Sequence, residues 1–250
     1  MFYQILSGLL IPLAGTTAGS SCVFFMKNSK MNSRIQCGLS CFAAGIMTAA
    51  SVWSLLIPSF EMSGQGSTRI LPVVGFWMGI LFIFFVDKMS KRLQKLSRNP
   101  LFLTAFSVAL HNLPEGMAVG AVYAGLVSDD PSVSFAQALT FCIGISCQNF
   151  PEGAIISMPL FSGGTKKFKS FFLGFLSGVV EPVGTAITIL LATAIIPALP
   201  WFLSFAAGAM IYVVVEELIP MKVCFKKRGA GVMFFAAGFS LMMSLDVFLG

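Results

Sequence analysis

Charged residues are scarce in this sequence. Asp, Glu, Lys and Arg together make up 10% of its 250 residues, whereas about a quarter of the residues in a soluble domain are charged. Hydrophobic residues make up 56% of the chain, and Phe alone occurs 26 times. This balance excludes an ordinary soluble domain and predicts a protein that crosses a lipid bilayer several times.

Linkers and low-complexity stretches are also missing, because long apolar runs take up nearly the whole chain. A helix that crosses the hydrocarbon needs about 20 residues. The runs are continuously apolar rather than alternating, which favours helices over a membrane barrel. We therefore expect an all-α integral membrane protein with a single domain over residues 1–250 and eight transmembrane helices, at about 3–26, 36–60, 70–87, 101–127, 133–161, 169–192, 198–220 and 230–248.

Basic residues are nearly absent from one of the two sides that these runs define. Every Lys and Arg except Arg69 follows an odd-numbered run. The positive-inside rule places that side in the cytoplasm and both termini outside. The net charge of +6 then reflects topology and attraction to anionic lipid headgroups, so that no nucleic-acid partner is expected.

Common metal-binding side chains are few. The six cysteines form no Cys-x-x-Cys pair, and His111 is the only histidine. These counts exclude a thiolate zinc site of the usual spacing and the His-Glu-x-x-His helix of zinc proteases. With one imidazole, an intramembrane metalloenzyme is disfavoured, so we expect neither an enzyme nor a bound cofactor.

Two of the apolar runs nevertheless contain nearly the same polar motif, [His/Gln]-Asn-x-Pro-Glu-Gly, at residues 111–116 and 148–153. Glu115 and Glu152 of these motifs, and Glu181 of the next run, are expected near the middle of the membrane. An unpaired charge there costs about 2.5–3.5 kcal/mol even on the lenient insertion scale. No Lys or Arg lies in the middle of these runs to neutralise them, so an ion or substrate path is favoured over a structural polar cluster.

The spacing within each motif predicts a binding geometry. The first residue and the carboxylate are four positions apart, which places both on one helical face. Pro114 and Pro151 each remove an N–H donor and bend the helix. Interrupted helices at corresponding positions are the best sequence indication of a transporter's binding site. One imidazole, three carboxylates and carboxamide oxygens suit Zn²⁺, with Mn²⁺, Fe²⁺ and Cd²⁺ as further candidates.

A repeat also runs through the chain. Residues 42–47, Phe-Ala-Ala-Gly-Ile-Met, recur as Phe-Ala-Ala-Gly-Ala-Met at residues 205–210, and both runs close with Ile-Pro. We expect an inverted repeat that relates runs 1–3 to runs 6–8 and run 4 to run 5. Residues 235–238 are again Phe-Ala-Ala-Gly, so that small-residue packing alone would also produce such matches.

The doubled motif, the pair Glu181-Pro182 and the eight runs together resemble the ZIP (Zrt/Irt-like) divalent metal transporters, and Gln148 resembles their GufA-like branch. The resemblance implies transport of zinc, and of cadmium, iron or manganese, toward the cytoplasm by alternating access, in a homodimer. The short chain favours a bacterial inner membrane. The metal is then the substrate. The alternative is a proton-coupled transporter of another solute that uses the carboxylates as a proton relay.

The resemblance also implies a role for each polar residue of the motifs. Gln148 stands where many relatives have His, and Asn149 where some have an acid, which puts a second bound metal in doubt. Met47 matches a thioether ligand of some bacterial members, although packing explains it equally well. The implied metal ligands are His111, Glu115, Gln148 and Glu152 at the transport site, Asn112, Asn149 and Glu181 at an adjacent position, and Met47.

Overall fold

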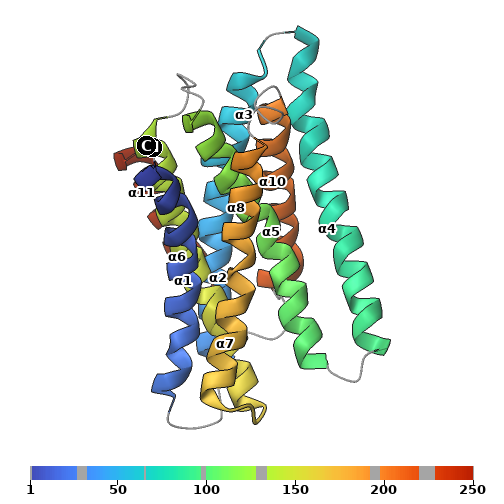
Figure 1. Cartoon of the computed structure of the whole chain (residues 1–250), viewed down its shortest axis with the longest axis vertical. Coiled ribbons are helices and arrows are strands. Elements are labelled where there is room, and N and C mark those ends of the chain that lie inside the picture. Colours follow the sequence, from blue (N-terminus) through green and yellow to red (C-terminus); the bar gives the residue numbers. More distant parts are fainter. Residues whose placement is uncertain are drawn as a thin grey trace.

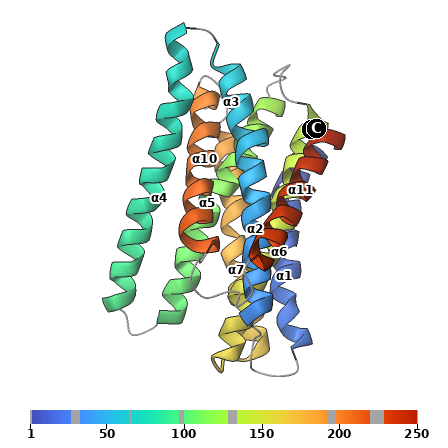
Figure 2. The ribbon, with the colours of Figure 1, turned by 180° about the vertical axis from the view of Figure 1, so that it is seen from behind.

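A computed structural model describes residues 2–26, 33–64, 66–96, 100–127, 134–191, 198–219 and 229–249. Within these ranges the chain is helical and contains no strand, which confirms the expected all-α class. The long helices run up and down a single bundle (Figures 1 and 2), and α1 begins at the end of the bundle where α11 ends (Figure 1).

Each of the eight apolar runs coincides with a helical segment, and two of these segments change helix type along their length. The first half contains α1 (Phe2–Phe25), α2 (Ser33–Ala50), the π-helix η1 (Ser51–Leu56), α3 (Ile57–Met62), the 3₁₀ turn η2 (Gly66–Ile70), α4 (Leu71–Leu96) and α5 (Pro100–Val127). The second half contains α6 (Phe135–Ser162), α7 (Lys167–Gly178), α8 (Val180–Leu190), α10 (Leu199–Val213), the π-helix η4 (Val214–Leu218) and α11 (Ala230–Leu249).

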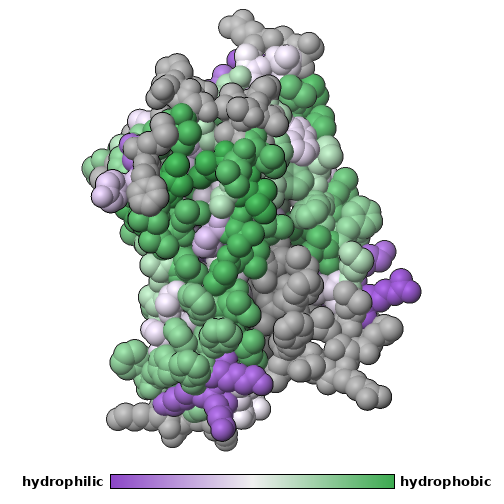
Figure 3. All heavy atoms as spheres, viewed as in Figure 1, coloured by the Kyte–Doolittle hydropathy of each residue, from purple (hydrophilic) through white to green (hydrophobic). Residues whose placement is uncertain are grey.

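Six helical segments of the described chain are long and apolar enough to cross a membrane. They are Tyr3–Phe25, Arg34–Met62, Thr68–Arg92, Lys167–Leu190, Leu199–Glu216 and Ala230–Phe248. The two remaining long helices, α5 and α6, carry the polar motifs and have 28 residues each. Hydrophobic side chains cover most of the middle of the bundle, and hydrophilic ones gather toward its ends (Figure 3). The protein is therefore of the integral membrane class.

Two helix pairs pack through the same reciprocal contact. A Cβ atom on Gly45 of α2 would overlap the main-chain carbonyl of Phe235 of α11, and one on Gly238 would overlap that of Phe42. The Phe-Ala-Ala-Gly of residues 235–238 is thus the packing partner of the one at residues 42–45. The pair α4 and α10 crosses in the same way, with Gly79 against Phe205 and Gly208 against Phe76.

The two π-helices occupy matching places after the Phe-Ala-Ala-Gly sequences of residues 42–45 and 205–208. Ser51 begins η1 four residues after Met47, and Val214 begins η4 four residues after Met210. A π-helical turn inserts an extra residue into the helix and often marks a functional segment. The sequence match between these runs therefore extends to a shared local irregularity.

The run from Lys167 to Leu190 is broken in its middle. The first part, α7, ends at Gly178, and α8 begins at Val180. Pro182 has no N–H group and leaves the carbonyl of Gly178 without its helical donor, which favours a break at this point. The break places Glu181 in the first turn of α8, inside the bundle.

Candidate metal-binding site

Glu181 is the centre of a buried polar cluster that joins four helices. Its carboxylate is 1% exposed. Three side chains donate to it: Asn149 Nδ2 at 2.5 Å, Asn112 Nδ2 at 3.2 Å and Thr16 Oγ1 at 3.3 Å. These donors come from α6, α5 and α1, so Glu181 of α8 holds both motifs and the first helix together.

The two asparagines also connect their helices to neighbouring backbone. Asn112 Nδ2 donates to the carbonyl of Ser177 at 3.3 Å, and Asn149 Nδ2 donates to the carbonyl of Pro12 at 3.2 Å. Each motif is therefore anchored by the same residue, through the same kind of bond, to a different partner helix.

The motif glycines allow these helices to approach closely. A Cβ atom on Gly116 would overlap the main-chain carbonyl of Glu181, and one on Gly153 would overlap that of Thr16. Hydroxyl groups then bond across the same crossings, Thr185 Oγ1 to the Gly116 carbonyl at 2.9 Å and Ser20 Oγ to the Gly153 carbonyl at 3.4 Å. Glycine is required at both motif positions because only a hydrogen fits there.

Around this cluster the structure buries further acceptor oxygens. Glu115 is 2% exposed, Gln148 is fully buried, and Glu152 is 7% exposed. Among the described residues, no hydrogen-bond donor reaches Glu115 Oε2, Gln148 Oε1 or Asn149 Oδ1. Residues 99–165 and 170–221 contain no Lys or Arg. Buried acceptors without a donor are costly, and a cation would satisfy several of them at once.

One of the eight candidate ligands, Met47, stands apart from this cluster, and one, His111, is described only in its backbone. The backbone of His111 lies in α5 four residues before Glu115, while its side chain is outside what the structure describes. Met47 is fully buried in the apolar core among residues such as Ile145 and Met210, which favours packing as its role. Among the described side chains, no three of the types His, Cys, Asp or Glu converge as a metal site, so a metal cage here depends on carboxamide oxygens and on His111.

Thr16 is the residue of the cluster that the motifs alone did not predict. It is fully buried and lies on the first helix, within the run Gly-Thr-Thr-Ala-Gly of residues 15–19. This run of small and polar residues, shortly after Pro12 in an otherwise apolar helix, is the sequence feature by which it could have been found.

The Thr16 hydroxyl contributes one of three donors to Glu181, which leads to a prediction. Thr16→Val keeps the shape of the side chain but removes the donor. Since a hydrogen bond to a charged group is worth about 1.5–3 kcal/mol, we expect zinc affinity of the purified protein to fall by roughly tenfold, measured by calorimetry. Thr16→Ser retains the hydroxyl and serves as the control. Equal affinity of the valine variant and the original protein would contradict this role.

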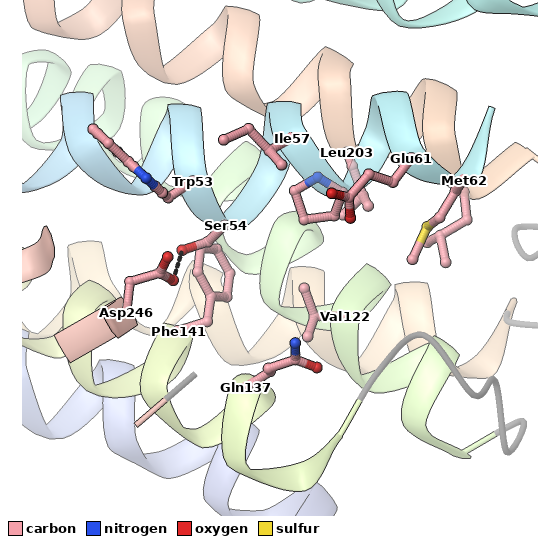
Figure 4. Close-up of a pocket in the computed structure, with 12 residues that line it drawn as sticks. Trp53, Ser54, Ile57, Glu61, Met62, Val122, Gln137, Phe141, Leu203 and Asp246 are labelled. Atoms are coloured by element: carbon pink, nitrogen blue, oxygen red, sulfur yellow. Dashed lines mark hydrogen bonds between the residues drawn. The ribbon is translucent and has the colours of Figure 1, made fainter. Parts of the chain in front are cut away.

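A cavity of about 230 Å³ opens near α3. It lies between η1, α3, α10 and α11 on one side and α5 and α6 on the other, with Val122 and Phe141 on the latter wall (Figure 4). Its acidic lining residues are Glu61 and Asp246, and Ser54 Oγ donates to Asp246 at 3.4 Å. Of the seven candidate ligands whose side chains are described, none lines this cavity.

The profile of the ZIP zinc transporter family matches residues 95–246, a range that contains both motifs and Glu181. The chain belongs to the ZIP family. The sequence is 31% identical to zinc transporter ZIP11 of Xenopus tropicalis, over 99% of this chain and 97% of that protein. It is 31% identical to zinc transporter GufA of Myxococcus xanthus (95% and 96% covered) and 29% to zinc transporter ZIPB of Bordetella bronchiseptica (99% and 82% covered).

These matches confirm the resemblance read from the motifs, including its GufA-like branch. The ZIP family consists of metal transporters, which also confirms that the protein is not an enzyme and that a metal would be its substrate rather than its cofactor.

Proposed function

We propose that this ZIP family member carries divalent transition-metal cations across a membrane, zinc first among them and cadmium, iron or manganese as further substrates. The observation that carries this proposal is that Glu115, Glu152 and Glu181 are buried, together with amide oxygens that no donor of the described residues reaches. In an acidic, oxygen-rich cluster without a basic residue, a bound cation would offset the buried negative charge. Oxygen ligands with a single imidazole suit divalent metals of borderline hardness.

We propose that α5 and α6 also cross the membrane, which gives eight spans. At 1.5 Å per residue, a helix of 28 residues is about 42 Å long, more than the hydrocarbon requires. The basic residues Lys88, Lys91, Arg92, Lys166, Lys167 and Lys169 would then lie at one end, with both termini at the other. By the positive-inside rule that end is cytoplasmic, and uptake runs toward it.

An inverted repeat and alternating access belong to the same proposal. The paired contacts support a repeat in which α1 corresponds to α7 and α8, and α5 to α6. Asn112 bonds to Ser177 as Asn149 bonds to Pro12, and Thr185 bonds to Gly116 as Ser20 bonds to Gly153. Two such halves with exchanged conformations would expose a midplane site first to one side and then to the other.

In this scheme the cavity beside α3 is the outer mouth of the path. Its carboxylates, Glu61 and Asp246, would raise the local cation concentration. Phe141, which is 2% exposed, and Leu203 line its wall and are part of the apolar core. A closed apolar layer between the mouth and the carboxylates is what one side of an alternating-access carrier requires.

The test is metal uptake into liposomes that contain the purified protein, with Zn²⁺, Cd²⁺, Mn²⁺ and Fe²⁺ compared. We expect saturable Zn²⁺ uptake that is absent from protein-free liposomes. The alternative function, proton-coupled transport of another solute, would appear as transport that persists in the presence of a metal chelator.

Chemical cross-linking in native membranes tests the proposed homodimer, and expression in a bacterial inner membrane tests the proposed location.

Gln148 is the position at which metal selectivity is most readily changed. Gln148→His would add a second imidazole to the site, and imidazole favours Zn²⁺ over Mn²⁺. We expect the ratio of Zn²⁺ to Mn²⁺ uptake to rise by roughly tenfold, an order of magnitude typical of one improved ligand. Gln148→Glu, which keeps oxygen donors, is the matched control and should not raise the ratio. An unchanged ratio in the histidine variant would place Gln148 outside the metal's coordination sphere.

A further inference from the structure

A second polar region, which shares no residue with the Glu181 cluster, lies at the basic end of the bundle. It is an open cavity of about 510 Å³ between α4 and the junction of α10 with η4. Basic side chains from α4 and aromatic rings from both helices share its lining, which consists of Phe84, Asp87, Lys88, Lys91, Arg92, Tyr212 and Glu216.

The two acids of this cavity already have partners within the protein. Lys91 Nζ lies 2.7 Å from Asp87 Oδ2 and 2.9 Å from Glu216 Oε1. The Tyr212 hydroxyl donates to Asp87 Oδ2 at 3.2 Å, and Asp87 is 6% exposed. One lysine and one hydroxyl group therefore hold both carboxylates and tie α4 to α10.

The two other basic side chains of the cavity, Lys88 and Arg92, form no ion pair among the described residues. Lys88 and Arg92 are one turn apart on the same face of α4, where like charges repel. Within the described part of the chain, neither has an anionic partner, and Lys88 Nζ lies only over the ring of Phe84, 6.0 Å from its centre. With two acids and three bases, the cavity carries a net charge of +1 and would accept an anion between Lys88 and Arg92.

The surroundings of Lys88 and Arg92 indicate that the bound anion also has an apolar part. Arg92 ends the apolar span Thr68–Arg92, so Lys88 and Arg92 lie where the hydrocarbon meets the headgroups. Directly above them α4 exposes Leu81 by 47% and Phe85 by 60%. Figures 1 and 3 show α4 at one edge of the bundle, with hydrophilic atoms below an apolar surface.

We propose that this cavity binds the phosphate headgroup of an anionic phospholipid, with Lys88 and Arg92 on the phosphate and the acyl chains along Leu81 and Phe85. Basic pockets between membrane helices recognise anionic headgroups in this way. The lipid would reinforce the contact between α4 and α10 that Lys91 already makes. This site is independent of the proposed metal transport.

The experiment is native mass spectrometry of the full chain, purified in detergent and titrated with phosphatidylglycerol or phosphatidylcholine. We expect one phosphatidylglycerol to be retained per chain and little phosphatidylcholine. Because each basic residue near an anionic lipid contributes about 1 kcal/mol, the double variant Lys88→Gln/Arg92→Gln should bind phosphatidylglycerol about thirtyfold more weakly.

The matched control is Lys166→Gln/Lys169→Gln, which removes two basic residues at the same end, on and just before α7, and should retain the lipid. Size-exclusion chromatography and uptake in phosphatidylcholine liposomes confirm that both double variants are folded. If the control variant lost as much lipid, general surface charge would explain the binding, and the proposed site would be wrong. Displacement of the lipid by inorganic phosphate would also overturn it, since a free anion would then be the ligand.

Discussion

Glu152→Ala should reduce zinc uptake into proteoliposomes by at least about a hundredfold, because removal of one partner of a buried ion pair, here a carboxylate opposite the bound cation, costs about 3–5 kcal/mol. Glu152 is 7% exposed and follows Pro151 in the second motif. If the metal passes between Glu115, Glu152 and Glu181, the alanine variant loses a ligand and the charge that offsets the cation.

The variant needs controls for folding and for charge. Glu152→Gln keeps the size of the side chain and removes only its charge, so it should lose nearly as much transport while remaining as stable as the original protein. Glu216→Ala removes a carboxylate of the surface ion pair with Lys91 and should retain most of the uptake, since exposed pairs contribute little. Full transport by both Glu152 variants would place the metal path elsewhere.

Gly153→Ala is expected to destabilise the protein and to disrupt the site at the same time. A Cβ atom at this position would overlap the carbonyl of Thr16, so α1 and α6 would have to move apart. Such overpacking costs about 1–3 kcal/mol and would also displace Thr16 and Asn149 from Glu181. We expect a lower melting temperature in detergent together with reduced zinc uptake.

Gly163→Ala is the matched control for this change. Gly163 caps the same helix, and an added Cβ would have its nearest neighbour at 3.4 Å, an ordinary contact. It should leave both the melting temperature and the uptake unchanged. Normal stability and transport in Gly153→Ala would show that α1 and α6 are less closely packed than the structure indicates.

The chain's periodicity and composition predicted the helices well. All eight apolar runs coincide with helical segments because about 20 continuous apolar residues leave few other ways to satisfy the backbone in lipid. The breaks inside the runs were less predictable. Pro182 signals the break before α8, whereas the π-helices η1 and η4 depend on how each helix packs against its neighbours and have no simple residue signature.

The candidate site was likewise predictable only in part. Spacing placed the first residue and the carboxylate of each motif on one helical face, and the missing Lys and Arg indicated a cation. Spacing could not show that Asn112 and Asn149 both donate to Glu181, or that Thr16 joins them from a helix 165 residues away. Those contacts depend on which helices pack together, and that is decided by glycines at crossings such as Gly116 and Gly153.

By itself, the sequence determined the membrane class, the positions of the helices and the family, and it predicted which polar residues form the candidate site. These follow from local properties: apolar length, charge and a motif repeated at fixed spacing. The tertiary structure alone decided which polar atoms meet. In the structure, Met47 lies in the apolar core and Thr16 lies in the carboxylate cluster. The physical reason is that helices remote in sequence become neighbours only where small residues let their backbones approach closely.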